Sequence, residues 1–252
     1  MVYFVGAGSG APDLITVRGQ RLLREADVII YAGSLVNPAL LEEAKENCEI
    51  YNSAYMNLEQ VIRVMETAEE EGQMTVRLHT GDPSIFGAVR EQIDALKERR
   101  IPYEVCPGVS SFCGAAAALQ AEYTLPGVSQ TVIITRMEGR TPVPDKEKLK
   151  DLAKHRATLI LFLSAGLTGQ VQKELLCEGG YSEDTPAALV YKATWPEEKV
   201  VRGVLGQLNQ LAQQNDIRKT ALIVVGDCLG NDYELSKLYD ASFSTGFRKG
   251  TE

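Results

Sequence analysis

Residues 78–87 read LHTGDPSIFG, and they are the stretch from which the fold of this chain can be deduced. Residues 74–78 before them have the pattern of a buried strand, and residues 84–99 after them have the apolar spacing of a helix. The loop between follows a parallel strand at its carboxyl end, where open α/β sheets bind ligands. Gly81 permits a positive φ or a close backbone approach, and Asp82 is a candidate to accept hydrogen bonds from a ligand. The alternative for Asp82 is an Asx turn or a helix N-cap.

The same alternation of strand and helix extends through the first half of the chain. Because each strand is followed by a helical segment, the pattern predicts a mainly parallel five-stranded sheet with right-handed crossovers. The expected strands are 2–5, 27–31, 49–51, 74–79 and 102–105, and the expected helices are 14–24, 38–46, 58–71, 84–99 and 112–119.

The second half has a different strand order. The segments 186–191 and 199–202 are separated by only a few residues, which predicts an antiparallel hairpin and therefore a mixed sheet. We expect two α/β domains, 1–122 and 123–252. The other strands expected in the second are 131–134, 158–163 and 221–225, and its helices are 146–154, 167–177 and 205–213.

Composition limits the classes of function. The chain has 252 residues, 44% of them hydrophobic, and a net charge of −8, which disfavours nucleic acid and anionic membranes as partners. No apolar run approaches the ~18–20 residues of a membrane span. The five cysteines are scattered and without CxxC spacing, which predicts free thiols, a cytoplasmic location and no protein metal site.

The loop at residues 6–11, GAGSGA, fits the dinucleotide pattern G-x-G-x-x-[G/A]. However, the strand 27–31 ends without the acid that holds a ribose, and Pro12-Asp13 occupies the place where a phosphate-binding helix should begin. A nicotinamide-dependent oxidoreductase therefore remains only as an alternative, which tight binding of NAD would support.

A second loop repeats the arrangement after strand 102–105. Pro107-Gly108 turns the chain, and Ser110 and Ser111 place hydroxyl and N–H groups at the start of a helix of small residues. Helix capping is the alternative explanation of these serines.

Four motifs in order resemble the S-adenosylmethionine-dependent tetrapyrrole methyltransferases: VGAGSGAPDLIT at 5–16, TGDP at 80–83, PGVSS at 107–111 and VYKATWP at 190–196. Ser9 and Ala11 stand where that family usually has Pro and Asp. Segments at 31–35, 129–131, 135–140 and 237–248 are similar to the branch that methylates C11 of precorrin-4 or cobalt-precorrin-4 in cobalamin synthesis.

The resemblance implies two α/β domains with the active site in the cleft between them, a homodimer, and S-adenosyl-L-methionine as cofactor with S-adenosyl-L-homocysteine as product. Ser164 and Ala193 are carried over by their positions at strand ends. The cofactor contacts that it implies are Pro12, Thr80, Gly81, Asp82, Ile85, Ser110, Ser111, Ser164 and Ala193.

The chemistry that the resemblance implies needs little from the protein beyond alignment and exclusion of water, because the sulfonium is already activated. No dedicated base is evident; Asp82 is a weak candidate, and His79 is a candidate to touch substrate. Any cobalt would arrive with the substrate.

The substrate's carboxylates call for local basic residues in this acidic chain. The candidates near the mouths of the expected loops are Arg18, Arg77, Arg136 and Arg140. Of these, Arg136 and Arg140 are expected to bind the macrocycle. Ordinary surface arginines are the alternative. A C-methyltransferase acting on another ring carbon and a non-catalytic tetrapyrrole-binding protein also stay open.

Overall fold

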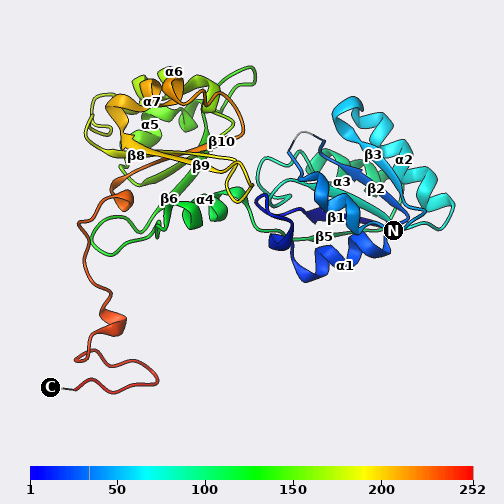
Figure 1. Cartoon of the computed structure of the whole chain (residues 1–252), viewed down its shortest axis with the longest axis horizontal. Helices are drawn as coiled ribbons and strands as arrows, with labels where there is room; N and C mark the ends of the chain where they lie inside the picture. Colours follow the sequence, from blue (N-terminus) through cyan, green and yellow to red (C-terminus); the bar gives the residue numbers. More distant parts are fainter. Residues whose placement is uncertain (34, 252) are drawn as a thin grey trace. The chain divides into compact units, whose positions relative to one another are not determined.

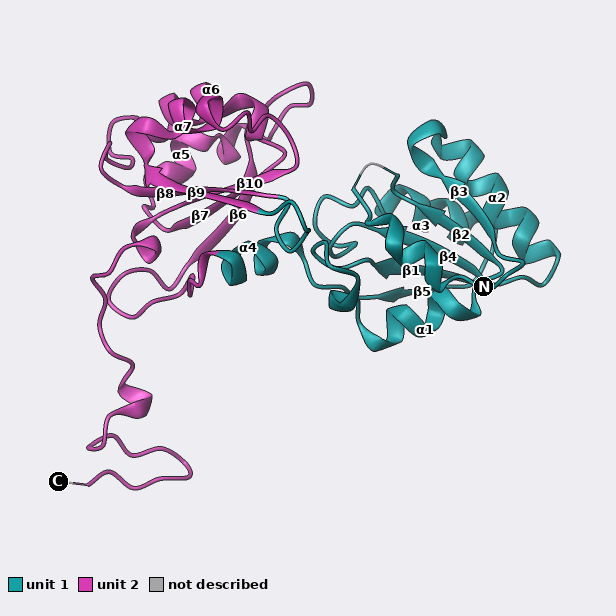
Figure 2. Cartoon of the chain, in the orientation of Figure 1, with its two compact units in different colours: residues 1–118, 192–198 teal, residues 119–191, 199–252 magenta. Residues whose placement is uncertain are grey.

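The computed structural model describes residues 1–33 and 35–251 (Figure 1), so Ser34 of the segment 31–35 lies outside the described residues. The chain forms two compact units, shown in Figure 2. The first contains residues 1–118 and 192–198, and the second contains residues 119–191 and the chain from Lys199 onward.

The first unit is built on a parallel sheet with the strand order β3-β2-β4-β1-β5, which confirms the predicted five strands. The chain leaves β1 toward β2 on one side and leaves β4 toward β5 on the other, so the topological switch point lies between β1 and β4. The strands are β1 (Val2–Gly6), β2 (Val28–Tyr31), β3 (Glu49–Asn52), β4 (Thr75–His79) and β5 (Tyr103–Cys106).

Helices cover both faces of this sheet (Figure 1). On one face α1 (Val17–Glu25) contributes Leu22 and Leu23 to a core. On the other face α2 (Leu58–Glu70) and α3 (Arg90–Glu98) pack Ile62, Met65 and Leu96 against the strands. A further helix of small residues, α4 (Ser111–Leu119), follows β5.

Two helices begin later than the apolar pattern predicts. The helix expected from residue 84 begins at Arg90, because Phe86 and Ala88 have φ of +54° and +48°, which an α-helix cannot contain. The helix expected from residue 14 begins at Val17, because the Thr16 hydroxyl accepts the Gly19 N–H at 3.1 Å and caps it there.

Two other expected helices are shorter than predicted. Residues Pro38–Glu43 form a 3₁₀ turn, and α5 spans only Leu149–Ala153. Extended residues bound both segments, since Ala44 with a ψ of 144° ends the first and Lys148 with a ψ of 140° separates α5 from the 3₁₀ turn before it.

The second unit contains a mixed sheet with the order β6-β7-β10-β8-β9. Strands β6 and β7 are parallel, and the other pairs are antiparallel, including the predicted β8–β9 hairpin. Helices α5, α6 (Thr168–Leu175) and α7 (Leu208–Gln214) lie on one face over an aliphatic core. The strands are β6 (Val132–Arg136), β7 (Thr158–Phe162), β8 (Pro186–Tyr191), β9 (Lys199–Val204) and β10 (Ala221–Val225).

The hairpin turn of residues 192–198 belongs by its contacts to the first unit, although it lies within the second of the two domains expected from the sequence. Within residues 1–33 and 35–251, no helix has the length and apolar character needed to cross a bilayer.

Candidate functional site

Two loops meet at the carboxyl edge of the first sheet, at its switch point. The N–H of Gly81 donates to the Gly8 carbonyl at 3.0 Å, and the Gly8 N–H donates to the Gly81 carbonyl at 3.3 Å. The Ala7 N–H also donates to the His79 carbonyl at 2.7 Å. The glycine-rich loop after β1 and the GDP loop after β4 are therefore held together by backbone hydrogen bonds.

The loop after β5 joins this pair through a carboxylate. Oδ2 of Asp82 accepts the Gly108 N–H at 2.8 Å. A Cβ on Gly108 would collide with the Gly81 carbonyl oxygen, and a Cβ on Gly81 would lie 3.3 Å from the Ser111 nitrogen. These close approaches explain why glycines occupy the loops. They also bring the predicted residues Gly81, Asp82 and Ser111 together.

Both oxygens of the Asp82 carboxylate accept hydrogen bonds from the protein. Its Oδ1 accepts the Ser84 N–H at 2.8 Å and also the Ser84 hydroxyl. Burial alone would raise the pKa of the Asp82 carboxyl, but the hydrogen bonds from Ser84 and Gly108 together hold that pKa below its ordinary value. An ionised carboxylate with both oxygens occupied is suited to fixing loops, and this favours the Asx-turn alternative over a general base.

The turn of residues 192–198 completes the loop cluster. The Thr194 hydroxyl accepts the Ala11 N–H at 3.0 Å and lies 3.1 Å from the Ser9 hydroxyl. Trp195 packs so closely against Gly10 that a Cβ there would collide with the indole. Ala193, which was predicted from the sequence, is buried beside Gly10. Thr194 was not predicted, because its partners lie more than 180 residues away in the sequence.

Two buried side-chain atoms at this edge lack a hydrogen-bond partner within the described chain: Oγ1 of Thr80 and Nε2 of His79. His79 is 4% exposed and lies 6.0 Å from the Phe4 ring. Burial, and then the charge of Arg77, lower the pKa of His79 to about 3, so the imidazole is neutral at neutral pH. A buried polar atom without a protein partner is a position at which a ligand or an ordered water can supply one.

Arg77 corrects one expectation. It was expected at a loop mouth, available to substrate carboxylates, but it is buried and its guanidinium donates to Gln92 and to the Ile30 carbonyl. The inward-facing position in a strand that is covered on both faces explains this burial.

The remaining predicted residues of the first unit lie around the cluster. Pro12 begins a 3₁₀ turn after the glycine-rich loop, Arg18 is exposed near the start of α1, and Ile85 is half-buried in the segment after Asp82. Ser110 is buried before α4, and its carbonyl accepts the Cys113 N–H at 3.0 Å.

Three predicted residues belong to the second unit. The buried Ser164 hydroxyl accepts the Met137 N–H at 2.8 Å and donates to the Phe162 carbonyl at 2.6 Å, so its side chain joins the ends of β6 and β7. The Arg136 guanidinium donates to the Thr141 and Pro142 carbonyls at 3.1 and 2.6 Å. Arg136 therefore shapes the loop that carries the exposed Arg140.

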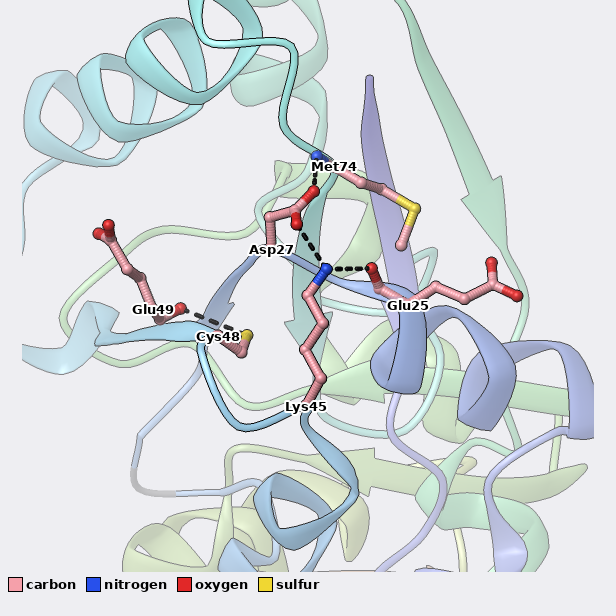
Figure 3. Close-up of polar contacts among 6 residues, drawn as sticks. All are labelled: Glu25, Asp27, Lys45, Cys48, Glu49 and Met74. Atoms are coloured by element: carbon pink, nitrogen blue, oxygen red, sulfur yellow. Dashed lines mark hydrogen bonds and ion pairs between the residues drawn. The ribbon is translucent and has the colours of Figure 1, made fainter.

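The opposite, amino-terminal edge of the first sheet has a hollow of about 550 Å³. Figure 3 shows Lys45 there, donating to Asp27 at 2.5 Å and to the Glu25 carbonyl at 3.2 Å. Asp27 also accepts the Met74 N–H at 2.7 Å, so its charge is matched. Within residues 1–33 and 35–251, no group of three His, Cys, Asp or Glu side chains is placed to hold a metal ion.

A family model described as Tetrapyrrole (Corrin/Porphyrin) Methylases matches residues 1–209. The chain belongs to this family. The resemblance deduced from the motifs is thereby confirmed, as are the fold class and the assignment to the methyltransferases.

Particular members of the methylase family are close in sequence and structure. A cobalt-precorrin-4 C(11)-methyltransferase of Methanocaldococcus jannaschii is 57% identical over 98% of this chain and 96% of its own length. The X-ray structure of a cobalt precorrin-4 methyltransferase, described as a cobalamin biosynthetic enzyme, matches with a TM-score of 0.89 and 50% identity. The match covers 91% of this chain and 96% of that chain. The crystal structure of a uroporphyrin-III C-methyltransferase of Thermus thermophilus, complexed with S-adenosylhomocysteine, has a TM-score of 0.74 and 27% identity. That match covers 91% of this chain and 93% of the other.

Proposed function

We propose that this methylase transfers a methyl group from S-adenosylmethionine to carbon 11 of precorrin-4 or its cobalt complex. The names of the M. jannaschii relative and of the structural neighbour at 50% identity support this reaction, and both favour the cobalt complex. On the chain itself, the observation that carries the proposal is the buried Oγ1 of Thr80, which lies among the hydrogen-bonded loops at the switch point and has no partner within residues 1–33 and 35–251.

The loop cluster fits a cofactor with polar groups. Glycines at three loops let backbone approach closely, and the Thr80 hydroxyl has unused donor and acceptor capacity. S-adenosylmethionine supplies a methyl group that is already activated by a sulfonium charge. The proposed contacts from the first unit are Pro12, Thr80, Gly81, Asp82, Ile85, Ser110, Ser111 and Ala193, with Ser164 added from the second unit.

The protein's own contribution is to orient and to exclude water. We assign Asp82 a positioning role, because its two oxygens fix the loops after β4 and β5. We propose that the neutral His79 supplies a hydrogen bond without a charge on the substrate side of the loops.

Substrate carboxylates are proposed to bind Arg18, Arg136 and Arg140. Arg140 is exposed in a loop whose path the Arg136 guanidinium holds. We expect Arg140→Ala to raise the KM for the tetrapyrrole about tenfold, as the loss of one charge-assisted contact would. Unchanged KM values in Arg136→Ala and Arg140→Ala would refute the proposal that these arginines bind the substrate carboxylates.

For assembly and location, we propose a cytoplasmic homodimer. The family resemblance supports the dimer, and the five unpaired cysteines support a reducing compartment. Sedimentation equilibrium tests the dimer: a single species of the 27.6 kDa monomer mass at micromolar concentration would contradict it.

The reaction is tested with methyl-labelled S-adenosylmethionine and enzymatically prepared precorrin-4, with and without cobalt. Mass spectrometry and carbon NMR locate the label. Label on carbon 11 supports the proposal, and the faster substrate identifies the preferred form. Label on another carbon would overturn the regiochemistry within the family. Cofactor binding without any transfer would favour a tetrapyrrole-binding protein.

A further inference from the structure

A buried chain of hydrogen bonds connects β4 to the segment after the GDP loop. Arg77 is 7% exposed, and its Nε donates to Oε1 of Gln92 on α3 at 3.0 Å. Gln92 is 5% exposed, and its Nε2 donates in turn to the Ala88 carbonyl at 2.9 Å. One amide therefore links the strand to residue 88.

Only one orientation of the Gln92 amide satisfies both neighbours. A guanidinium can only donate and a backbone carbonyl can only accept, so the amide accepts from Arg77 and donates to Ala88. An ionised glutamate has the same size but only acceptor oxygens. Glutamine is thus the residue type of this size that serves both contacts.

The positive charge of Arg77 does not by itself account for an amide at this position. Within residues 1–33 and 35–251, no carboxylate forms an ion pair with the buried Arg77, and burial lowers the pKa of its guanidinium to about 10. A carboxylate at position 92 would supply a counter-charge for Arg77, although its own desolvation would offset part of that gain. What the amide adds is its N–H donor to Ala88.

The Ala88 carbonyl belongs to a segment whose backbone conformation is intrinsically unfavourable. Phe86 and Ala88 are both in the left-handed region, with φ of +54° and +48°. The Asp82 carboxylate holds the start of this segment through Ser84, and Gln92 holds its end. Ile85 lies between these two anchors.

We propose that Gln92, oriented by Arg77, is a positioning residue for cofactor binding. It holds residues 83–89 in the conformation that presents Ile85 and the GDP loop to S-adenosylmethionine. This inference rests on the proposed function, in which that loop binds the cofactor.

The deciding variant is Gln92→Glu, because it keeps the acceptor for Arg77 and replaces the donor to Ala88 by a second acceptor. We expect the first unit to remain folded with a free energy of unfolding close to that of the wild type, because the counter-charge for Arg77 offsets the desolvation of the carboxylate and the lost hydrogen bond to Ala88. The Kd for S-adenosylhomocysteine, measured by calorimetry, should rise about tenfold. Hydrogen exchange of the amides of residues 84–90 should be faster. Gln213→Glu makes the same chemical change on an exposed part of α7 and should leave all three measurements unchanged.

An unchanged Kd in folded Gln92→Glu would overturn the inference. If that variant does not fold, the double variant Arg77→Met with Gln92→Met removes the buried charge together with the link to Ala88, and it should show the same rise in Kd; an unchanged Kd there would also overturn it. If the wild-type chain itself binds no S-adenosylhomocysteine, the proposed function fails first, and the inference fails with it.

Discussion

Lowering the pH from 7.5 to 5.0 should destabilise the first unit through one residue, His79. Its side chain is 4% exposed, and burial together with the charge of Arg77 lowers its pKa from 6.5 to about 3. Between these two values the unfolded chain binds a proton that the folded chain does not bind. Stability therefore rises with pH in this window: the contribution is complete above pH 6.5 and is lost as the pH falls.

The size of this loss in the free energy of unfolding follows from the difference between the working pH and 6.5. Each pH unit costs about 1.4 kcal/mol until the folded pKa is reached, so 1.5 units give about 2 kcal/mol at pH 5.0. This loss does not depend on the folded pKa as long as that pKa lies well below 5. At pH 5.0 Asp82, whose pKa is lowered, is still ionised, so its contribution is retained.

Urea unfolding followed by tryptophan fluorescence measures the stability of the first structural unit, because the single tryptophan, Trp195, belongs to that unit together with His79. The wild type should lose about 2 kcal/mol more than His79→Gln between the two pH values. His155 is exposed in the second unit, and His155→Gln should show the full wild-type loss. Equal losses in the wild type and in His79→Gln would refute the assignment of a buried, neutral imidazole.

Three further substitutions test separate parts of the structure. Thr194→Val should lower the free energy of unfolding of the first unit by about 1–2 kcal/mol, because the Ala11 N–H loses its acceptor; Thr194→Ser, which keeps the hydroxyl, should be close to wild type, and urea unfolding distinguishes them. Asp82→Asn should weaken S-adenosylhomocysteine binding in calorimetry about tenfold, since an amide cannot accept at both positions; unaltered binding would contradict the role of the carboxylate in fixing the loops. Leu161→Ala should destabilise the second unit by about 2–5 kcal/mol in circular dichroism, whereas Leu238→Ala, at an exposed position, should have an effect below about 0.5 kcal/mol.

The strands of both sheets were predictable because their apolar runs are short, continuous and bounded by turns. The run Thr158–Phe162 is buried over its first four residues, and Leu159 and Leu161 lie in the aliphatic core of the second unit. Helix starts were less predictable, because they depend on single hydrogen bonds. The cap at Thr16 and the left-handed residues Phe86 and Ala88 override an apolar pattern that continues through them.

The proximity of the candidate residues was predictable where a motif lies within one loop after a strand, and not where its parts come from distant segments. Gly81, Asp82 and Ser111 are brought together as the motifs indicated. Thr194 was missed because its partners lie at the opposite end of the chain. Arg77 was assigned to the surface because a charged residue in a strand gives no sign that an amide on a later helix will accept from it.

The central claim is that the loop cluster of the first unit binds the cofactor, and Thr80 tests it most directly. Its Oγ1 is buried and has no hydrogen-bond partner among residues 1–33 and 35–251. Thr80→Val removes only that hydroxyl, so the free protein should be as stable as wild type or more stable. The Kd for S-adenosylhomocysteine should rise about tenfold, and Thr80→Ser should restore binding. A Thr80→Val protein that binds S-adenosylhomocysteine as tightly as wild type would contradict the claim.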